Sequence, residues 1–426
     1  MDKKPYARAL EWLRLVSVTG VGQSLVQGLA LISGFLIIQL ISPQQYALYT
    51  LAYATLGTIG TLADGGIGAG VMAHGARDWR NAQGLGGVLA AGMKLRRLFA
   101  GISLAVALPV LVYLLHRNQA DAWTVALIVL ALLPALYAAL TEDLLEIPLK
   151  LHQDITSLQR NQVLTNLLRV FAVIGSLLLL PLAMVAILAN GLPRIWGNFR
   201  LRRIVSSYAD PAARPDPVAR KEILGMVRQT FPGALYYAVS GQITVWLVSI
   251  FGSTLALAQV GALGRFSAVL SVFGAMFSTL ALPRFARLPS DAGILMSRFL
   301  LILSAVLLLS VLFPLIAYFF PAQVLLALGK DYAGLDYELF LCVVGGCVSM
   351  VVGVLYGLSV ARGWVVPFAF SISSSIAVQV LLVVMLDLST SANVMLYSLF
   401  NAVWGFVMYL GYFLYRMLKV GKDAGA

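Results

Sequence analysis

The sequence predicts an all-α polytopic membrane protein, because its composition, the length of its apolar runs and the placement of its basic residues all indicate one. Of its 426 residues, 60% are hydrophobic and 11% are charged, whereas soluble domains average about 45–50% apolar and about 25% charged residues. About twelve apolar runs are each long enough, at roughly 20 residues, to cross the hydrocarbon core as a helix. We therefore expect two bundles of six transmembrane helices.

A basic segment divides the apolar runs into two groups. Residues 200–228 contain seven Arg and Lys residues and three prolines. Such a segment stays outside the hydrocarbon, and its basic residues favour the cytoplasmic side. We predict a first bundle over 1–199, a cytoplasmic linker over 200–228, a second bundle over 229–418 and a cytoplasmic tail over 419–426. The expected spans are approximately 18–41, 46–72, 96–115, 122–141, 161–180, 182–199, 229–251, 257–282, 294–319, 335–360, 365–386 and 392–415.

Lys and Arg alternate with the apolar runs along the whole chain. The loops assigned to the far side of the membrane contain only Arg117 and Lys330, and the other loop Lys and Arg residues fall on the cytoplasmic side. This alternation requires an even number of spans and predicts that both termini are cytoplasmic. Because it also explains the formal net charge of +12, we expect no nucleic-acid partner.

The two groups of spans suggest an internal repeat. The segments SPQQYALYTLAYATLGTI and GSTLALAQVGALGRFSAVLSV both follow the first span of their half. With an even number of spans in each half, the two repeats have the same orientation, and their pseudo-twofold axis lies along the membrane normal. This arrangement is typical of transporters that alternate access to a cavity between two lobes.

Two stretches resemble a known family. Residues 40–77, LISPQQYALYTLAYATLGTIGTLADGGIGAGVMAHGAR, resemble the opening helical hairpin of the bacterial polysaccharide flippases of the Wzx type. The Asp-x-Gly of that family corresponds to Asp64 and Gly66, whereas Ala47 stands where a Gly is usual. Residues 326–340, LALGKDYAGLDYELF, resemble the turn before the tenth helix of the same family.

This resemblance implies a fold and a function. The fold is the alternating-access, MATE-like fold of the multidrug/oligosaccharidyl-lipid/polysaccharide exporter superfamily. The function is to flip an oligosaccharide on an undecaprenyl-diphosphate type of lipid across the bacterial inner membrane, for O-antigen or another cell-surface polysaccharide. Membrane lipids surround such a protein, and a polysaccharide polymerase and chain-length proteins are its implied partners. No cofactor is implied.

Ionisable residues inside the spans are the most informative candidates, because each costs about 2.5–3.5 kcal/mol at a helix centre. Arg265 lies about two turns inside its predicted helix, where its guanidinium offers two parallel donors to a diphosphate. The alternative is that Arg265 reaches the outer head groups by snorkelling. Asp64 is a candidate ligand of a coupling ion, and its alternative is a structural hydrogen bond at the inner helix end.

Polar faces supply the remaining candidates for substrate binding. Tyr49 and Tyr53 share one helix face with Asp64 and could contact sugar rings, although tyrosines and small residues also pack helices together. Amides can bind sugar hydroxyls, but they also join helices by hydrogen bonds. The other polar candidates are Gln23 and Gln27 on the first span, and Asn166 and Arg169 on the fifth.

Other function classes find less support in the sequence. We interpret the carboxylates Glu142, Asp143 and Glu146 as a solvated helix end, and the sequence shows no metal-ligand spacing and no hydrolase or ATPase motif. The main rival is a cation-coupled multidrug antiporter of the same superfamily. A membrane enzyme would need a large outer loop, and a scaffold without transport activity stays open. The sugar, the lipid carrier, the coupling ion and the oligomeric state also stay open.

Overall fold

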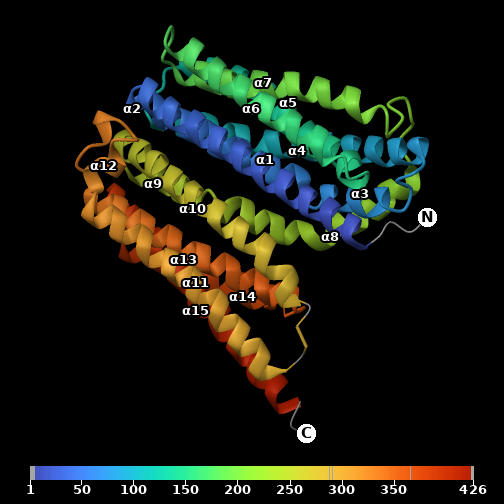
Figure 1. Ribbon diagram of the computed structural model, residues 1–426. Coiled ribbons are helices and arrows are strands. Elements are labelled where there is room, and N and C mark those ends of the chain that lie inside the picture. Colours follow the sequence, from blue (N-terminus) through green and yellow to red (C-terminus); the bar gives the residue numbers. More distant parts are fainter. Residues whose placement is uncertain (1–4, 287, 290, 365, 424–426) are drawn as a thin grey trace. The chain divides into compact units, whose positions relative to one another are not determined.

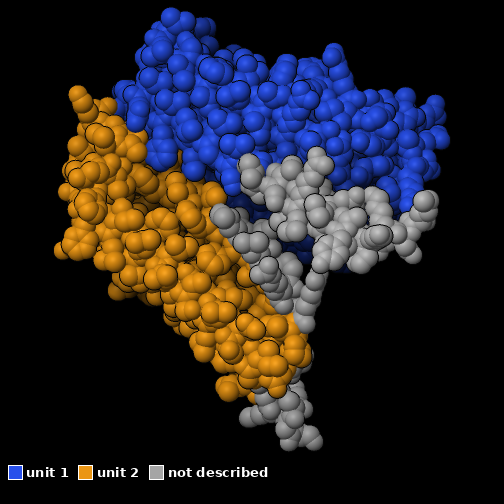
Figure 2. Space-filling model, viewed as in Figure 1, with its two compact units in different colours: residues 1–246 blue, residues 247–426 orange. Residues whose placement is uncertain are grey.

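A computed structural model describes residues 5–286, 288–289, 291–364 and 366–423. Their regular structure is entirely helical, so the predicted all-α class is confirmed (Figure 1). The chain divides into two compact units, Met1–Trp246 and Leu247–Ala426, which Figure 2 shows in blue and orange.

The first unit is built from long helices that begin at recognisable caps. Ser42 accepts a hydrogen bond from the backbone N–H of Gln45, and Asp121, Asp154 and Asp216 cap the helices that follow them in the same way. The helices are α1 (Pro5–Leu40), α2 (Pro43–Asp64), α3 (Ile67–Gly75), α4 (Ala82–Arg117), α5 (Ala122–Leu151), α6 (Ile155–Leu177), α7 (Ala183–Val205), α8 (Pro217–Ser240) and α9 (Ile243–Phe251), which crosses the boundary between the units.

The basic linker is mostly helical and lies against the first unit. Because α7 extends to Val205 and α8 begins at Pro217, only residues 206–216 of the predicted linker lie outside helices. The backbone N–H of Asp210 donates to the carbonyl of Ala82 at 2.8 Å, and that of Asp216 donates to the carbonyl of Gly87 at 3.1 Å. A Cβ at Gly86 would overlap the carbonyl oxygen of Asp210, so this close approach depends on glycine.

Tyr208 attaches the same linker to the start of α6. Its hydroxyl donates to Asp154 Oδ2 at 3.0 Å, and its ring packs on that of His152 with centroids 4.4 Å apart. Burial raises the pKa of Asp154, but hydrogen bonds from Ser157 and Tyr208 outweigh this effect and lower the pKa below its ordinary value. The carboxylate form of Asp154 therefore helps to hold the linker in place.

The helix α8 packs against α2, α3 and α4 and so belongs to the first unit by its contacts. The sequence placed residues 229–251, which cover its second half, at the start of the second bundle. The division of the chain into two membrane bundles at 229 stays a prediction.

The second unit has an apolar and aromatic core. Phe299 and Phe413 stack with ring centroids 4.2 Å apart, and Trp364 meets Phe413 edge-on at 5.4 Å. Phe285 joins the same buried cluster. The helices of this unit after α9 are α10 (Thr254–Ala286), α11 (Ala292–Phe319), α12 (Pro321–Leu325), α13 (Asp336–Ala361), α14 (Phe368–Met385) and α15 (Ser391–Asp423), with a 3-10 turn η1 (Lys330–Tyr332).

Eight of the described helices are long and apolar enough to cross a membrane, or nine if the bent pair α8–α9 forms one span. The predicted spans 46–72, 161–180 and 182–199 coincide with α2–α3, α6 and α7, which do not meet this standard. The count of twelve spans therefore stays a prediction. These three less apolar regions all belong to the first unit, where Asp64, Gln162 and Arg194 from them contact charged residues of α4 and α5.

Candidate functional site

A break between α2 and α3 positions Asp64. The helix α2 ends at this residue, and Gly65 and Gly66 follow with φ of +47° and +102°, a conformation that residues with side chains rarely adopt. The Asp64 carboxylate accepts hydrogen bonds from the backbone N–H of Gly66 at 3.3 Å and of Gly68 at 3.1 Å. It thus satisfies donors at the start of α3, where a negative charge is favourable.

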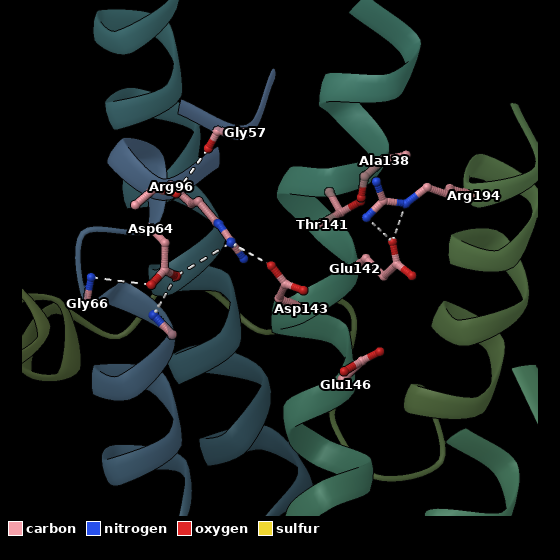
Figure 3. A network of polar contacts seen from close by, with 12 residues as sticks. Gly57, Asp64, Gly66, Arg96, Ala138, Thr141, Glu142, Asp143, Glu146 and Arg194 are labelled. Atoms are coloured by element: carbon pink, nitrogen blue, oxygen red, sulfur yellow. Dashed lines mark hydrogen bonds and ion pairs between the residues drawn. The ribbon is translucent and has the colours of Figure 1, made fainter. Parts of the chain in front are cut away.

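Arg96 joins three helices at this break. Its Nη2 lies 2.9 Å from Asp143 Oδ2 on α5 and 3.5 Å from Asp64 Oδ1 on α2, as Figure 3 shows. Arg96 itself is on α4 and is only 3% exposed. Its Nε and Nη1 are buried without a hydrogen-bond partner among the described residues. A buried guanidinium shared by two carboxylates links α2, α4 and α5 electrostatically.

A second ion pair lies between α5 and α7. Arg194 places both Nε and Nη2 2.7 Å from Glu142 Oε2 (Figure 3). One turn further along α5, Glu146 accepts hydrogen bonds from Lys150 at 2.7 Å and from Gln162 of α6 at 2.6 Å. Because each carboxylate has a hydrogen-bonded partner, its burial is compensated.

The predicted solvated helix end is therefore wrong for two of its three carboxylates. Glu146 is 7% exposed and the Glu142 side chain 21% exposed, whereas the Asp143 side chain is 66% exposed. The bases and amides that permit this burial come in part from α6 and α7. The spacing of the three carboxylates along the chain does not reveal these contacts with other helices.

A cavity of about 340 Å³ opens beside Arg96 within the first unit. It lies at the break between α2 and α3 and reaches α4, α5 and α8. Its lining combines two carboxylates, a guanidinium and a hydroxyl with small residues that leave the space unfilled. The lining residues are Gly60, Thr61, Asp64, Gly65, Gly66, Arg96, Asp143 and Ala234.

The two predicted tyrosines pack inside the first unit. Tyr49 stacks between Tyr46 and Tyr53, with centroids 5.7 and 5.3 Å away, and is 1% exposed. Its hydroxyl accepts a hydrogen bond from Asn190 Nδ2 at 3.1 Å. In this structure Tyr49 joins α2 to α7, and Tyr53 is half-buried. Contact of either ring with a sugar stays a prediction.

The predicted residues of α6 are Asn166 and Arg169, which belong to the first unit. Arg169 interacts electrostatically with Tyr53 and Glu142, and its Nε is buried without a hydrogen-bond partner among the described residues. Asn166 donates its amide to the carbonyl of Gln162 at 2.8 Å, one turn back on its own helix. The structure thus brings Arg169 and Tyr53 close to the Glu142–Arg194 pair.

The other predicted residues lie elsewhere. Gln23 is exposed and Gln27 half-buried on α1, which packs against α6. Arg265 is half-buried on α10 of the second unit. Of the predicted set, Asp64 alone lines the cavity.

Sequence reasoning missed Arg96, which the predicted span 96–115 placed at a membrane boundary. The helix α4 begins at Ala82, well before Arg96, so the side chain lies inside a helix bundle. The glycine-rich run Gly84–Gly92 made this helical start hard to recognise, because glycine is a poor helix former. An available signal was the carboxylate Asp64, which needs a compensating base nearby.

Comparisons with known proteins place the fold. No protein-family model and no curated protein matches the sequence. A multidrug resistance MATE family transporter of the MOP superfamily, in an inward-facing conformation, matches with a TM-score of 0.74 at 16% identity, over 93% of this chain and 96% of that chain. The lipid II flippase MurJ, in an inward closed conformation, matches with a TM-score of 0.73 at 12% identity, over 95% of this chain and 90% of that chain.

A MOP superfamily transporter from Pyrococcus furiosus also matches, with a TM-score of 0.58 at 17% identity, over 96% of this chain and 95% of that chain. The chain therefore has the fold of MOP-superfamily transporters, and the predicted MATE-like fold is confirmed. At sequence identities this low, the similarity shows a shared fold and does not extend to function.

Proposed function

We propose that this protein is a transporter that flips a lipid-linked oligosaccharide across the bacterial inner membrane for cell-surface polysaccharide synthesis of the O-antigen type. The carrier lipid is of the undecaprenyl-diphosphate type, and both termini are cytoplasmic. A polysaccharide polymerase and chain-length proteins are the proposed partners. The fold supports this proposal, because one protein that shares it is the lipid II flippase MurJ.

The observation that carries the proposal is an arginine inside the first unit that forms no ion pair among the described residues, although its neighbours do. Each carboxylate of the network has a basic partner: Arg96 for Asp64 and Asp143, Arg194 for Glu142, and Lys150 for Glu146. Arg169, by contrast, forms no ion pair among the described residues of that unit, and its Nε has no hydrogen-bond partner. A guanidinium outside any such ion pair, with an unused Nε donor beside Tyr53, suits an anionic substrate, such as a diphosphate with sugars attached.

A second candidate function is cation-coupled multidrug antiport, which the similarity to a multidrug resistance MATE transporter supports. Such a mechanism needs a carboxylate that can exchange a cation or a proton. Asp64 is the proposed coupling residue, but its oxygens already accept two backbone N–H groups and face Arg96. These contacts favour the structural role for Asp64, so we rank antiport second.

Arg265 is the proposed contact with the diphosphate in the second unit. A guanidinium can bind a diphosphate through two parallel hydrogen bonds, which the point charge of a lysine cannot reproduce. Flipping by Arg265→Lys should then be strongly impaired at normal expression. Full activity in Arg265→Lys together with near-normal activity in Arg265→Ala would leave only snorkelling as its role.

A transport assay separates the two functions. The full-length protein in proteoliposomes is given either a fluorescent undecaprenyl-diphosphate saccharide or the organic cation tetraphenylphosphonium. We expect the saccharide carrier to cross the bilayer and the cation gradient to stay unchanged. Cation movement without flipping of the saccharide carrier would instead establish the antiporter.

A further inference from the structure

We propose that the cavity at the α2–α3 break binds a sugar residue of the transported oligosaccharide through its hydroxyl groups. This inference rests on the proposed function and assigns the cavity to the sugar and not to the diphosphate or the lipid. Its volume, about 340 Å³, lies at the small end of the roughly 300–1,000 Å³ range of small-molecule sites. The cavity therefore suits one ring of a saccharide better than a whole oligosaccharide.

The lining offers mainly hydrogen-bond acceptors. Asp64 and Asp143 contribute carboxylate oxygens, and the Asp143 side chain is largely exposed. The Thr61 hydroxyl donates its hydrogen to the carbonyl of Gly57 at 3.0 Å, so its oxygen lone pairs remain as acceptors. A ligand that matches this lining must donate hydrogen bonds. A diphosphate has only acceptor oxygens and would be repelled by the two carboxylates.

Sugar hydroxyls fit this lining better than an organic cation does. The guanidinium of Arg96 lies against both carboxylates and offsets one of their two negative charges, so a cation gains less here than beside unpaired carboxylates. The backbone N–H groups of Gly66 and Gly68 further stabilise the charge of Asp64. Neutral hydroxyls can donate to such compensated carboxylates without adding charge.

Gly60 is a position from which a larger side chain can fill the cavity. A Cβ at Gly60 meets open space, and this residue lines the cavity. The Cβ of Gly60→Leu therefore enters open space, and leucine favours a helix more than glycine does. Gly101 on α4 is the matched control, because a Cβ there also meets open space and Gly101 does not line the cavity.

The first test measures flipping of a fluorescent undecaprenyl-diphosphate saccharide by these variants in proteoliposomes. Gly60→Leu should flip it about tenfold more slowly than the native protein, since the sugar loses its hydrogen bonds to the lining. Gly101→Leu should flip at the native rate, and both variants should unfold at the native temperature. Native flipping by Gly60→Leu would overturn the inference and leave the proposed function intact.

The second test measures binding without transport. The reaction rate of Gly60→Cys with N-ethylmaleimide is followed in the full-length protein, with the native chain, whose Cys342 and Cys347 are buried, as the background. The undecaprenyl-diphosphate saccharide should slow the reaction severalfold, and the same lipid diphosphate without sugar should not. Equal protection by the sugar-free lipid or by tetraphenylphosphonium, or no protection by the saccharide, would overturn the inference. If the native protein fails to flip the saccharide, the proposed function is wrong. The labelling result then decides by itself whether the cavity binds the sugar.

Discussion

Both units have a buried apolar core cluster, but their interiors differ in charge. In the first unit, ion pairs connect α2, α4, α5 and α7 through Arg96 and Arg194. The core cluster of the second unit is made of apolar and aromatic side chains, among them Phe299 and Phe413. Buried charges are costly unless paired, so a bundle that retains them is expected to use them. This difference supports the proposal that the first unit contacts a polar part of the substrate.

Removal of Arg96 tests the charged interior and should have the largest effect on stability. Arg96→Met leaves Asp64 and Asp143 without their base. Breaking a fully buried pair costs about 3–5 kcal/mol, and the 36% and 66% exposure of the Asp64 and Asp143 side chains reduces the expected loss below that range. The unfolding temperature of the purified protein in detergent should fall accordingly. Adding Asp143→Asn should recover part of the loss, and Arg203→Met, which changes an exposed arginine, should have no effect. An unchanged unfolding temperature in Arg96→Met would show that Arg96 does not stabilise the folded protein.

Truncation of a core aromatic tests the apolar interior of the second unit. Phe299→Ala removes the ring that stacks on Phe413. The loss should be smaller than the roughly 3–5 kcal/mol of such changes in soluble cores, because lipid is as apolar as the core itself and only packing contacts are lost. The same unfolding measurement applies. If Phe299→Ala costs more than Arg96→Met, the contrast between the two interiors is wrong.

The sequence predicted the architecture better than the site. Apolar runs of membrane length and alternating basic loops give the helical class directly, because both follow from the bilayer itself. Asp64 was also recognised, since a carboxylate within an apolar run is conspicuous. Its role as a cap depends on the left-handed Gly65 and Gly66, and its pairing depends on Arg96 of another helix.

The pair of Glu142 and Arg194 shows the same limit. These residues are 52 positions apart, and each lies near the end of its predicted span, where a charge usually reaches water. Only the packing of α5 against α7 brings them together. Spacing within one helix cannot reveal such a contact, because it reports neighbours three or four residues away.

Acid should weaken the attachment of the linker to the rest of the first unit, and this is the smallest of the expected effects on stability. The pKa of Asp154 in the folded protein lies below its ordinary value of 3.8. The stabilisation is therefore complete above that value and is lost as the pH falls through the lower, folded pKa. Hydrogen–deuterium exchange of residues 206–216 should rise in that acid range relative to the rest of the first unit. Asp154→Asn should abolish this difference, and a pH response that persists in Asp154→Asn would assign it to another group.

The most direct test of the proposed function is the flipping rate of an undecaprenyl-diphosphate saccharide by the native protein and by Arg169→Gln. A hydrogen bond to a charged group contributes about 1.5–3 kcal/mol, so Arg169→Gln should flip about tenfold more slowly or worse. Its unfolding temperature should not fall, because Arg169 forms no ion pair that the change would break among the described residues. Flipping at the native rate by folded Arg169→Gln would contradict the assignment of Arg169 to the anionic substrate.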